Sequence, residues 1–221
     1  MTKNPKIGLV TVLYNSKEVL VGFFESLAKQ TYKNYVLYII DNSPDDIALN
    51  EAKKLAQQHN IPTEFIKNNA NLGVAKGNNQ GIEKSLEFGC DYVLLLNNDI
   101  EFDENTIQNM LEYAEDKNES IIVPKIYYYG SNILWMAGGY ISKIRGVTPH
   151  RGEGEEDHGQ YDNIEYINYA PTCFMLIKSE VFLKVGLMDE KYFVYYDDTD
   201  FIYRANSLGY KIVYLPKCVV E

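Results

Sequence analysis

Apolar runs and amphipathic segments alternate along the first half of the chain. The apolar runs are short, rich in β-branched residues and typical of buried strands, and they cover residues 7–12, 35–40, 63–66 and 92–96. Between them, apolar residues recur at helical spacing, first over residues 20–27, behind Ser16 as a candidate helix cap. This alternation of strand and helix predicts an α/β fold with a mostly parallel central sheet and helices on both faces.

The second half of the chain is less regular. Further strands are predicted over residues 127–129, 134–144, 172–177 and 210–215, and helices over 180–185 and 199–208. The segment 150–163 is rich in glycine and acidic residues and poor in apolar ones, so we expect a mobile loop with little to pack against. No linker separates the two halves, which predicts a single domain over residues 1–221.

Composition narrows the class of protein. With 221 residues, of which 46% are hydrophobic, the chain can bury one substantial core. A formal net charge of −10 disfavours nucleic acid as a partner. Cys90, Cys173 and Cys218 are widely spaced, as expected for free thiols in a reducing compartment. The polar start of the chain lacks the apolar stretch of a signal peptide, and no apolar run is long enough for a membrane span, so we expect a cytoplasmic protein.

Polar side chains follow three of the predicted strands at the point where each strand ends. These strand ends are Tyr14-Asn15, Asp41-Asn42-Ser43 and Asn97-Asn98-Asp99. In open parallel sheets, ligands bind beyond the carboxyl ends of the strands. Three polar ends on one edge therefore predict a ligand site at this edge.

Asp99 is the candidate metal ligand at this edge. It follows the wholly apolar strand 92–96, and a carboxylate that faces a cleft from a buried strand end needs a cation. Mg²⁺ or Mn²⁺, held by one or two carboxylates together with phosphate oxygens, fits that chemistry. The alternative is a cap for a helix over residues 105–113, but Asp103 is better placed for that role.

Three glycines interrupt a predicted helix after Asn71. Gly73, Gly77 and Gly81 fall four residues apart and share one helix face, where each costs about 1 kcal/mol relative to alanine. Something must approach this face closely, and the sequence leaves open whether it is a neighbouring backbone or a ligand. The segment lacks the GxGxxG and GK[ST] patterns that are typical of phosphate-binding loops.

Acidic residues cluster in two places. For residues 153–157 a solvated surface is the favoured interpretation. Asp197, Asp198 and Asp200 instead follow a run of aromatic residues, and packing beside aromatic rings and like charges raises the pKa of a carboxyl towards that of a useful base. The alternative is that these residues complement the dipole at a helix N-terminus.

Taken in order, these segments resemble the family 2 inverting glycosyltransferases of GT-A fold, especially the branch with rhamnosyltransferases and related polysaccharide-assembly enzymes. The resemblance runs from Lys6 to the end of the chain. It includes the motifs Asn71-Leu72-Gly73 and Asn97-Asn98-Asp99. The complete set is nine segments, 11–15, 36–43, 71–73, 95–99, 137–139, 150–152, 175–177, 186–190 and 195–200, together with Arg204.

The resemblance implies a role for each candidate residue. Tyr14 would stack on the nucleobase, Asp41 would accept a hydrogen bond from its ring N–H, and Asn97 would contact the ribose or the diphosphate. Asp99 would bind the Mg²⁺ or Mn²⁺, and Asp198 would act as the general base. The remaining donor-binding residues that the resemblance implies are Asn15, Asn71, Gly73 and Asn98.

The implied reaction is a metal-dependent, inverting transfer of a sugar from a nucleotide-diphosphate donor to an acceptor hydroxyl. The donor would be dTDP-rhamnose or a UDP-sugar, and the acceptor a polysaccharide or a lipid-linked glycan. The nucleotide-sugar-binding half would cover about residues 1–123 and the acceptor half about residues 124–221.

Two features depart from the family pattern. Asn97 replaces the first acid of the DxD motif, which leaves Asp99 as the one strong metal ligand. The chain ends at Glu221, where the family usually places a His that binds metal or phosphate. We therefore expect a C-terminal truncation, with the missing region as a place for peripheral contact with the inner face of the membrane.

Two other functions compete with this interpretation. A nucleotidyltransferase shares the sheet topology and the metal site, but it needs a Gly-rich loop with Arg or Lys after the first strand, which Tyr14-Asn15-Ser16 does not supply. A sugar-nucleotide-binding module without catalysis needs no base, so the presence of Asp99 and Asp198 together argues against it.

Overall fold

A computed structural model describes residues 4–142 and 144–221. Residues 1–3 and 143 lie outside this part of the chain. The expectations for the polar start of the chain and for the segment 134–144 are therefore tested only for their remaining residues.

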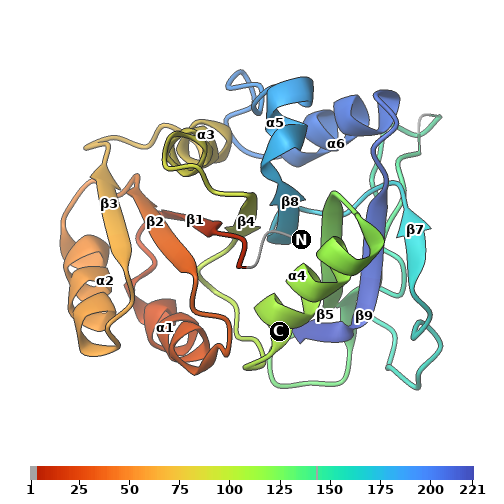
Figure 1. The fold of residues 1–221 in the computed structure, drawn as a ribbon, viewed down its shortest axis with the longest axis horizontal. Coiled ribbons are helices and arrows are strands. Elements are labelled where there is room, and N and C mark those ends of the chain that lie inside the picture. Colours follow the sequence, from red (N-terminus) through yellow and green to blue (C-terminus); the bar gives the residue numbers. More distant parts are fainter. Residues whose placement is uncertain (1–3, 143) are drawn as a thin grey trace.

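The strands of the described residues belong to one mixed sheet (Figure 1). They are β1 (Ile7–Leu13), β2 (Tyr35–Asp41), β3 (Thr63–Lys67), β4 (Tyr92–Leu96), β5 (Ile121–Tyr127), β6 (Leu134–Met136), β7 (Glu165–Ile167), β8 (Phe174–Lys178) and β9 (Ile212–Val220). The strand order is β3-β2-β1-β4-β8-β5-β9-β7, and β6 pairs with β5. Strands β3, β2, β1 and β4 are parallel, whereas β8 is antiparallel to both of its neighbours, β4 and β5.

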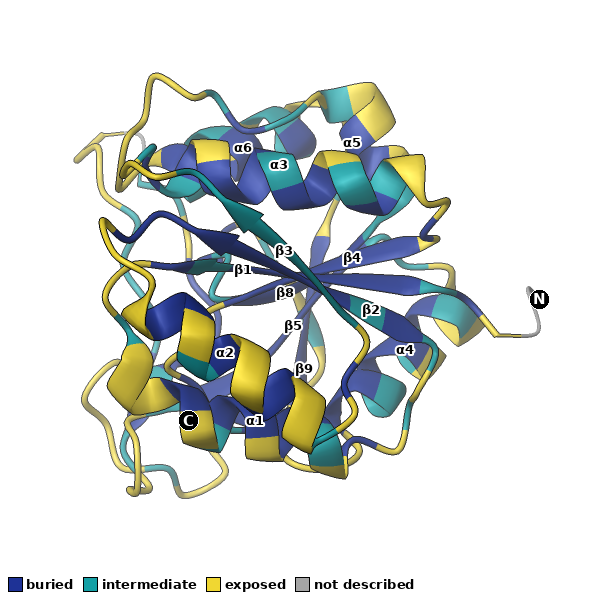
Figure 2. Ribbon diagram, turned by 90° about the vertical axis from the view of Figure 1, so that its left-hand side faces the viewer, coloured by how far each residue is buried: buried dark blue, intermediate teal, exposed yellow. Residues whose placement is uncertain are grey.

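Helices cover both faces of the sheet. They are α1 (Leu20–Lys29), α2 (Ile47–Gln58), α3 (Val74–Glu87), α4 (Thr106–Lys117), α5 (Ser179–Val185) and α6 (Asp197–Ser207), with a short 3₁₀ helix η1 (Lys17–Val19) before α1. Figure 2 shows α3, α5 and α6 on one face and α1, α2 and α4 on the other. The predicted α/β fold is therefore confirmed, with a sheet that is mixed rather than parallel throughout.

The glycine face of α3 packs against strand β1. A Cβ on Gly77 would lie 2.8 Å from the Val12 Cγ2 atom, and a Cβ on Gly81 would overlap with the Val10 side chain. These glycines let the helix approach the strand closely, so close packing rather than a ligand explains them.

The second half departs from the expected pattern. Strand β5 begins at Ile121 rather than at residue 127, and strand β7 was not expected. The expected strand over 134–144 is reduced to β6 and isolated bridges among its described residues, because Gly138 and Gly139 adjoin a turn of the chain.

The expectation that residues 150–163 have little to pack against is wrong. Leu134 and Ala137 donate backbone hydrogen bonds to this segment, of 2.8 Å to the Glu155 oxygen and 2.9 Å to the Arg151 oxygen. The buried Lys125 ammonium contacts the Asp157 carboxylate at 2.7 Å. Residues 153–157 are therefore not a uniformly solvated face, because Asp157 is one half of a buried ion pair.

Within residues 4–142 and 144–221, none of the helices combines the length and the apolar content needed to cross a bilayer. The residues Cys90 and Cys218 are buried and Cys173 is intermediate in exposure, and all three cysteines are free.

Candidate functional site

Two hollows meet at the carboxyl ends of β1 and β4. The first, which we call the strand-end hollow, has a volume of about 270 Å³ and is lined in part by Tyr14, Asn71 and Gly73. The second, which we call the α6 hollow, has a volume of about 680 Å³ and contains Asp198 at the start of helix α6. Both hollows share a boundary made by Val74, Asn97, Thr172 and Val194.

The turn that precedes α3 forms part of the wall of the strand-end hollow. Gly73 adopts a φ of +84°, and its amide donates a 3.0 Å hydrogen bond to Asn71 Oδ1. A Cβ at this position would overlap with the Phe193 carbonyl oxygen, so only glycine fits here. Asn42 Nδ2 donates a 3.0 Å hydrogen bond to the Gly73 oxygen and ties the turn to the end of β2.

Tyr14 and Asn97 face the open space of these hollows. The Tyr14 ring is 53% exposed and lines the strand-end hollow, which leaves a ring face available for stacking. Asn97 is exposed and lines both hollows, so it lies at the junction between them.

Three other predicted donor residues lie at the same sheet edge but line neither hollow. The Asn98 amide donates a 2.7 Å hydrogen bond to the Val12 oxygen and joins the ends of β4 and β1. Asn15 has a φ of +53° and donates its backbone N–H to Ser43 Oγ. Asp41 is fully buried, and its Oδ1 atom accepts a hydrogen bond from the Ser43 amide, whereas its Oδ2 atom has no partner among the described residues. Donor contact by these three residues stays a prediction.

Asp99 and Asp198 approach the same thiol from two elements. Burial, followed by the negative charges of Asp198 and Asp99, raises the pKa of Cys173 to about 12. Asp99 follows β4 and Asp198 lies in α6, so the predicted metal ligand and the predicted base act electrostatically on Cys173 from different elements; Asp198 lines the α6 hollow, whereas Asp99 lines neither hollow.

The residues around Asp99 fit a cation only if ligands from a bound diphosphate complete its coordination. Asp99 is exposed and makes no hydrogen bond or ion pair with the described residues, so its carboxylate is available. In the described part of the chain, no three His, Cys, Asp or Glu side chains gather closely enough to hold a metal by themselves. Mg²⁺ and Mn²⁺ accept one or two carboxylates completed by phosphate oxygens and water, so Asp99 fits a site that a bound diphosphate completes.

The carboxylate of Asp198 is held in a fixed position in the α6 hollow. Tyr169 Oη donates a 2.9 Å hydrogen bond to Asp198 Oδ2, and the Thr199 amide donates one of 2.5 Å to Oδ1. Burial, followed by the charge of Asp198, raises the pKa of Tyr169 well above its usual value, so this phenol stays a donor at neutral pH. Asp198 has an ordered orientation without a cationic partner among the described residues.

The neighbouring acidic residues have different environments. Asp197 is 5% exposed, and burial, followed by the charge of Asp198, raises its pKa to about 6. Asp200 Oδ2 accepts a 2.8 Å hydrogen bond from Arg204 Nε in an ion pair along the helix. Asp200 therefore has a structural partner, whereas Asp197 and Asp198 both line the hollow.

Aromatic side chains complete one wall of the α6 hollow. The His150 ring lies edge-on to Trp135, with centroids 4.5 Å apart, and is stacked on Tyr169 at 6.2 Å. Burial lowers the pKa of His150, so the ring is neutral at pH 7. Sequence reasoning missed Trp135 and Tyr169 as site residues. Their contacts join segments that lie far apart in the chain, and no local pattern marks them.

Comparison with known proteins shows which proteins this chain resembles. The family model described as "Glycosyl transferase family 2" matches residues 9–184. The chain is 26% identical over 203 residues to the low-salt glycan biosynthesis hexosyltransferase Agl10 of Haloferax volcanii. This alignment covers 90% of the chain and 61% of Agl10. It is 25% identical over 223 residues to the dTDP-rhamnosyl transferase RfbF of Shigella flexneri, covering 96% of this chain and 67% of RfbF. The chain thus spans about two thirds of the length of these relatives.

Solved structures share the fold at low sequence identity. The mannosyltransferase PcManGT from Pyrobaculum calidifontis, in complex with GDP-Man and Mn²⁺, superposes with a TM-score of 0.68 at 13% identity, covering 99% of this chain and 57% of that one. GalNAc-T7 with UDP, GalNAc and Mn²⁺ gives a TM-score of 0.77 at 14% identity, covering 100% and 44%. The predicted GT-A type of fold is confirmed.

Proposed function

Because this chain belongs to glycosyl transferase family 2, we propose that it transfers a hexosyl group from a nucleotide-diphosphate donor to an acceptor hydroxyl, with inversion and with the help of a divalent cation. Family membership confirms the resemblance seen in the sequence and argues against a nucleotidyltransferase. The donor would be dTDP-rhamnose or a UDP-sugar, and the acceptor a polysaccharide or a lipid-linked glycan.

The observation that carries this proposal is the junction of the two hollows. A nucleotide would fit the strand-end hollow, with its base on the exposed Tyr14 and its diphosphate at Asn97, two residues before Asp99. An acceptor fits the larger α6 hollow, where Asp198 is held by Tyr169. The anomeric carbon would then lie near Asn97 and Thr172, between the leaving diphosphate and the attacking hydroxyl.

The proposed transfer forms one bond, breaks one bond and moves one proton. The acceptor oxygen forms a bond to the anomeric carbon from the face opposite the diphosphate, the bond from that carbon to the diphosphate oxygen breaks, and Asp198 accepts the hydroxyl proton. Asp99 would hold the divalent cation, which would supply positive charge that stabilises the leaving diphosphate. The Tyr169 phenol keeps the proposed base oriented by its hydrogen bond to Asp198.

Calorimetry with UDP and with dTDP tests the donor site and its metal dependence. We expect binding in the presence of MnCl₂ and much weaker binding in EDTA, because without a cation the Asp99 carboxylate repels the diphosphate. Asp99→Asn should abolish the difference between MnCl₂ and EDTA, and Asp103→Asn, an exposed carboxylate outside both hollows, should preserve it. Equal affinity of the native protein in MnCl₂ and in EDTA would remove the cation from the mechanism.

Turnover tests the base and separates an enzyme from a binding module. In a transfer assay, Asp198→Asn should lose about 10²–10⁴-fold in kcat, the usual contribution of a general base, while nucleotide affinity stays unchanged. Asp197→Asn should cost less, because Asp198 is the carboxylate that Tyr169 orients. Near-native turnover of Asp198→Asn with an inactive Asp197→Asn would move the base to Asp197.

A further inference from the structure

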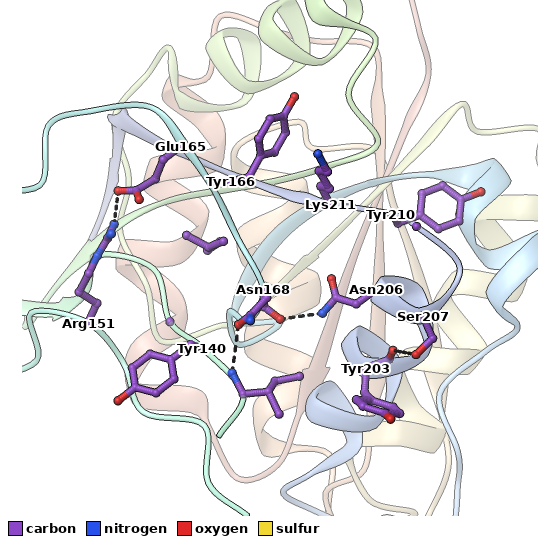
Figure 3. Close-up of a pocket in the computed structure, with 14 residues that line it drawn as sticks. Tyr140, Arg151, Glu165, Tyr166, Asn168, Tyr203, Asn206, Ser207, Tyr210 and Lys211 are labelled. Atoms are coloured by element: carbon purple, nitrogen blue, oxygen red, sulfur yellow. Dashed lines mark hydrogen bonds and ion pairs between the residues drawn. The ribbon is translucent and has the colours of Figure 1, made fainter. Parts of the chain in front are cut away.

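A third hollow lies at the outer edge of the sheet, beside strand β7. This β7-edge hollow has a volume of about 730 Å³ and lies between β7, the C-terminal half of α6 and residues 139–141 (Figure 3). None of its residues belongs to the donor or base assignments made above, so the reaction as proposed leaves it without a role.

The floor of this hollow is polar and firmly positioned. Asn206 Nδ2 donates a 2.7 Å hydrogen bond to the Asn168 oxygen, and Asn168 Oδ1 accepts one of 3.0 Å from the Ile141 amide. These bonds leave Asn168 Nδ2 and Asn206 Oδ1 without a partner among the described residues. Arg151 and Glu165 form an ion pair of 2.7 Å at one side. The hollow therefore offers fixed hydrogen-bond donors and acceptors. Its one charged side chain without an ion pair among the described residues is Lys211, whose Nζ atom lies 4.7 Å from the centroid of the Tyr166 ring.

Tyrosine rings surround this polar floor. Figure 3 shows Tyr140, Tyr166 and Tyr203 around Asn168 and Asn206. The rings of Tyr140, Tyr166 and Tyr203 are 53%, 56% and 45% exposed. Tyr166 is fixed by a 2.5 Å hydrogen bond from its hydroxyl to Glu119 Oε1. Apolar ring faces with polar tips around planar amides match a ligand with alternating C–H faces and hydroxyls, which is the chemistry of a sugar.

Helix α6 connects this hollow to the α6 hollow. Thr199, Tyr203 and Asn206 are spaced by four and three residues, so they share one face of the helix, and Tyr196 immediately precedes its first residue. Tyr196 and Thr199 line the α6 hollow, whereas Tyr203 and Asn206 line the β7-edge hollow. From Asp198 to Asn206 the helix rises roughly 12 Å, the length of a few sugar units.

The two hollows also adjoin on the other side of the sheet edge. Gly139 lines the β7-edge hollow and forms bridges to His150 and Tyr169, which line the α6 hollow. The backbone of Gly139 therefore lies between the walls of the two hollows.

We propose that the β7-edge hollow is a glycan-binding subsite that holds inner sugar units of an oligosaccharide acceptor whose terminal hydroxyl lies at Asp198. This proposal rests on the transferase function proposed above. The acceptor chain follows the α6 face from Thr199 to Tyr203, and the units furthest from the reacting hydroxyl contact Tyr140, Asn168 and Asn206. The site selects acceptors by length, because a single sugar at Asp198 does not reach it.

Binding to immobilised oligosaccharides tests the subsite. The probes are homologous series of rhamnose, galactose, glucose and mannose oligomers from one to six units, measured with bound UDP or dTDP and MnCl₂. In at least one series, we expect the affinity of the native protein to rise by about tenfold or more between the monomer and the hexamer. The double variant Tyr140→Ala, Tyr203→Ala should lose this gain and keep its affinity for the monomer and for the nucleotide.

The matched control is the double variant Tyr128→Ala, Tyr129→Ala, which removes two exposed tyrosines outside the β7-edge and α6 hollows and should behave as the native protein. Circular dichroism checks that both variants are folded. The subsite is refuted if no series shows a gain with length, if the Tyr140, Tyr203 variant keeps the gain, or if the control loses it equally. If nucleotide binding is absent as well, the transferase function itself fails; normal nucleotide binding without a length effect overturns the subsite alone.

Discussion

Replacing Asp197 with asparagine should stabilise the domain at neutral and higher pH. Asp197 is 5% exposed at the start of α6, and burial, followed by the charge of Asp198, raises its pKa from 3.8 to about 6. At pH 7 the folded protein must therefore keep a charge where a neutral group is preferred. Asparagine has nearly the same shape and carries no charge, so it removes this cost.

The magnitude follows from linkage between protonation and folding. Between pH 4 and pH 6 the folded state binds more protons at Asp197 than the unfolded state, so the free energy of unfolding falls as the pH rises through this window. A pKa that is raised by about two units lowers the free energy of unfolding by about 3 kcal/mol at pH values above 6. Because solvent screens part of the carboxyl group, we expect a gain of about 1–3 kcal/mol for Asp197→Asn at pH 8, and almost none at pH 4.

Urea unfolding of the native protein and of Asp197→Asn, at several pH values from 4 to 8, measures this difference. Asp200→Asn is the control on the same helical turn, because it breaks the ion pair with Arg204 and should give no gain at high pH. If Asp197→Asn is no more stable than the native protein at pH 8, or if its advantage does not grow between pH 4 and pH 6, the burial argument for Asp197 is wrong.

Three further changes test the packing and the site. Gly81→Ala should lower the free energy of unfolding by about 1–3 kcal/mol in urea titrations, because its Cβ overlaps with a β1 side chain, whereas Gly22→Ala meets mainly the end of a flexible carboxylate and should be nearly neutral. Lys125→Met should destabilise by about 3–5 kcal/mol in the same assay, because Asp157 is left buried without its cation. Tyr169→Phe should lower kcat about tenfold or more and move the acidic limb of the pH–rate profile to higher pH, with nucleotide affinity unchanged, because the proposed base loses a hydrogen-bond donor.

The sheet of the first half could be predicted because its signals are local. Strand β4 is apolar at every position and ends at a polar residue, as a strand buried on both faces must. Strand β5 was missed because Pro124 and Lys125 interrupt its apolar pattern. Lys125 is nevertheless buried, because carboxylates more than 30 residues away, at Asp157 and Asp162, neutralise it. The burial of Lys125 could not be predicted from its neighbours in the sequence, because its partners lie far away along the chain.

The candidate site shows the same division between local and distant information. The meeting of polar strand ends follows from the direction of parallel strands, and Tyr14 and Asn97 do line one space. The hydrogen bonds that hold Asn98 and orient Asp198 depend on register and on a tyrosine 29 residues before the base. The Asn98 contact requires β1 and β4 to pair in the observed register, and the Asp198 contact requires antiparallel β8 to place the second half of the chain beside β4.

The environments of the three carboxylates in α6 argue for a division of roles. Asp200 is neutralised by Arg204, so a proton on it would break an ion pair. Asp197 is nearly enclosed, which raises its pKa but leaves little surface for an acceptor hydroxyl to approach. Asp198 is partly exposed, lines the hollow and is oriented by a phenol, so it is the carboxylate that can both meet a hydroxyl and accept its proton. Because the same helix carries Tyr203 and Asn206 on the face that continues from Thr199, the axis of α6 would fix the proposed base and the direction of the acceptor together.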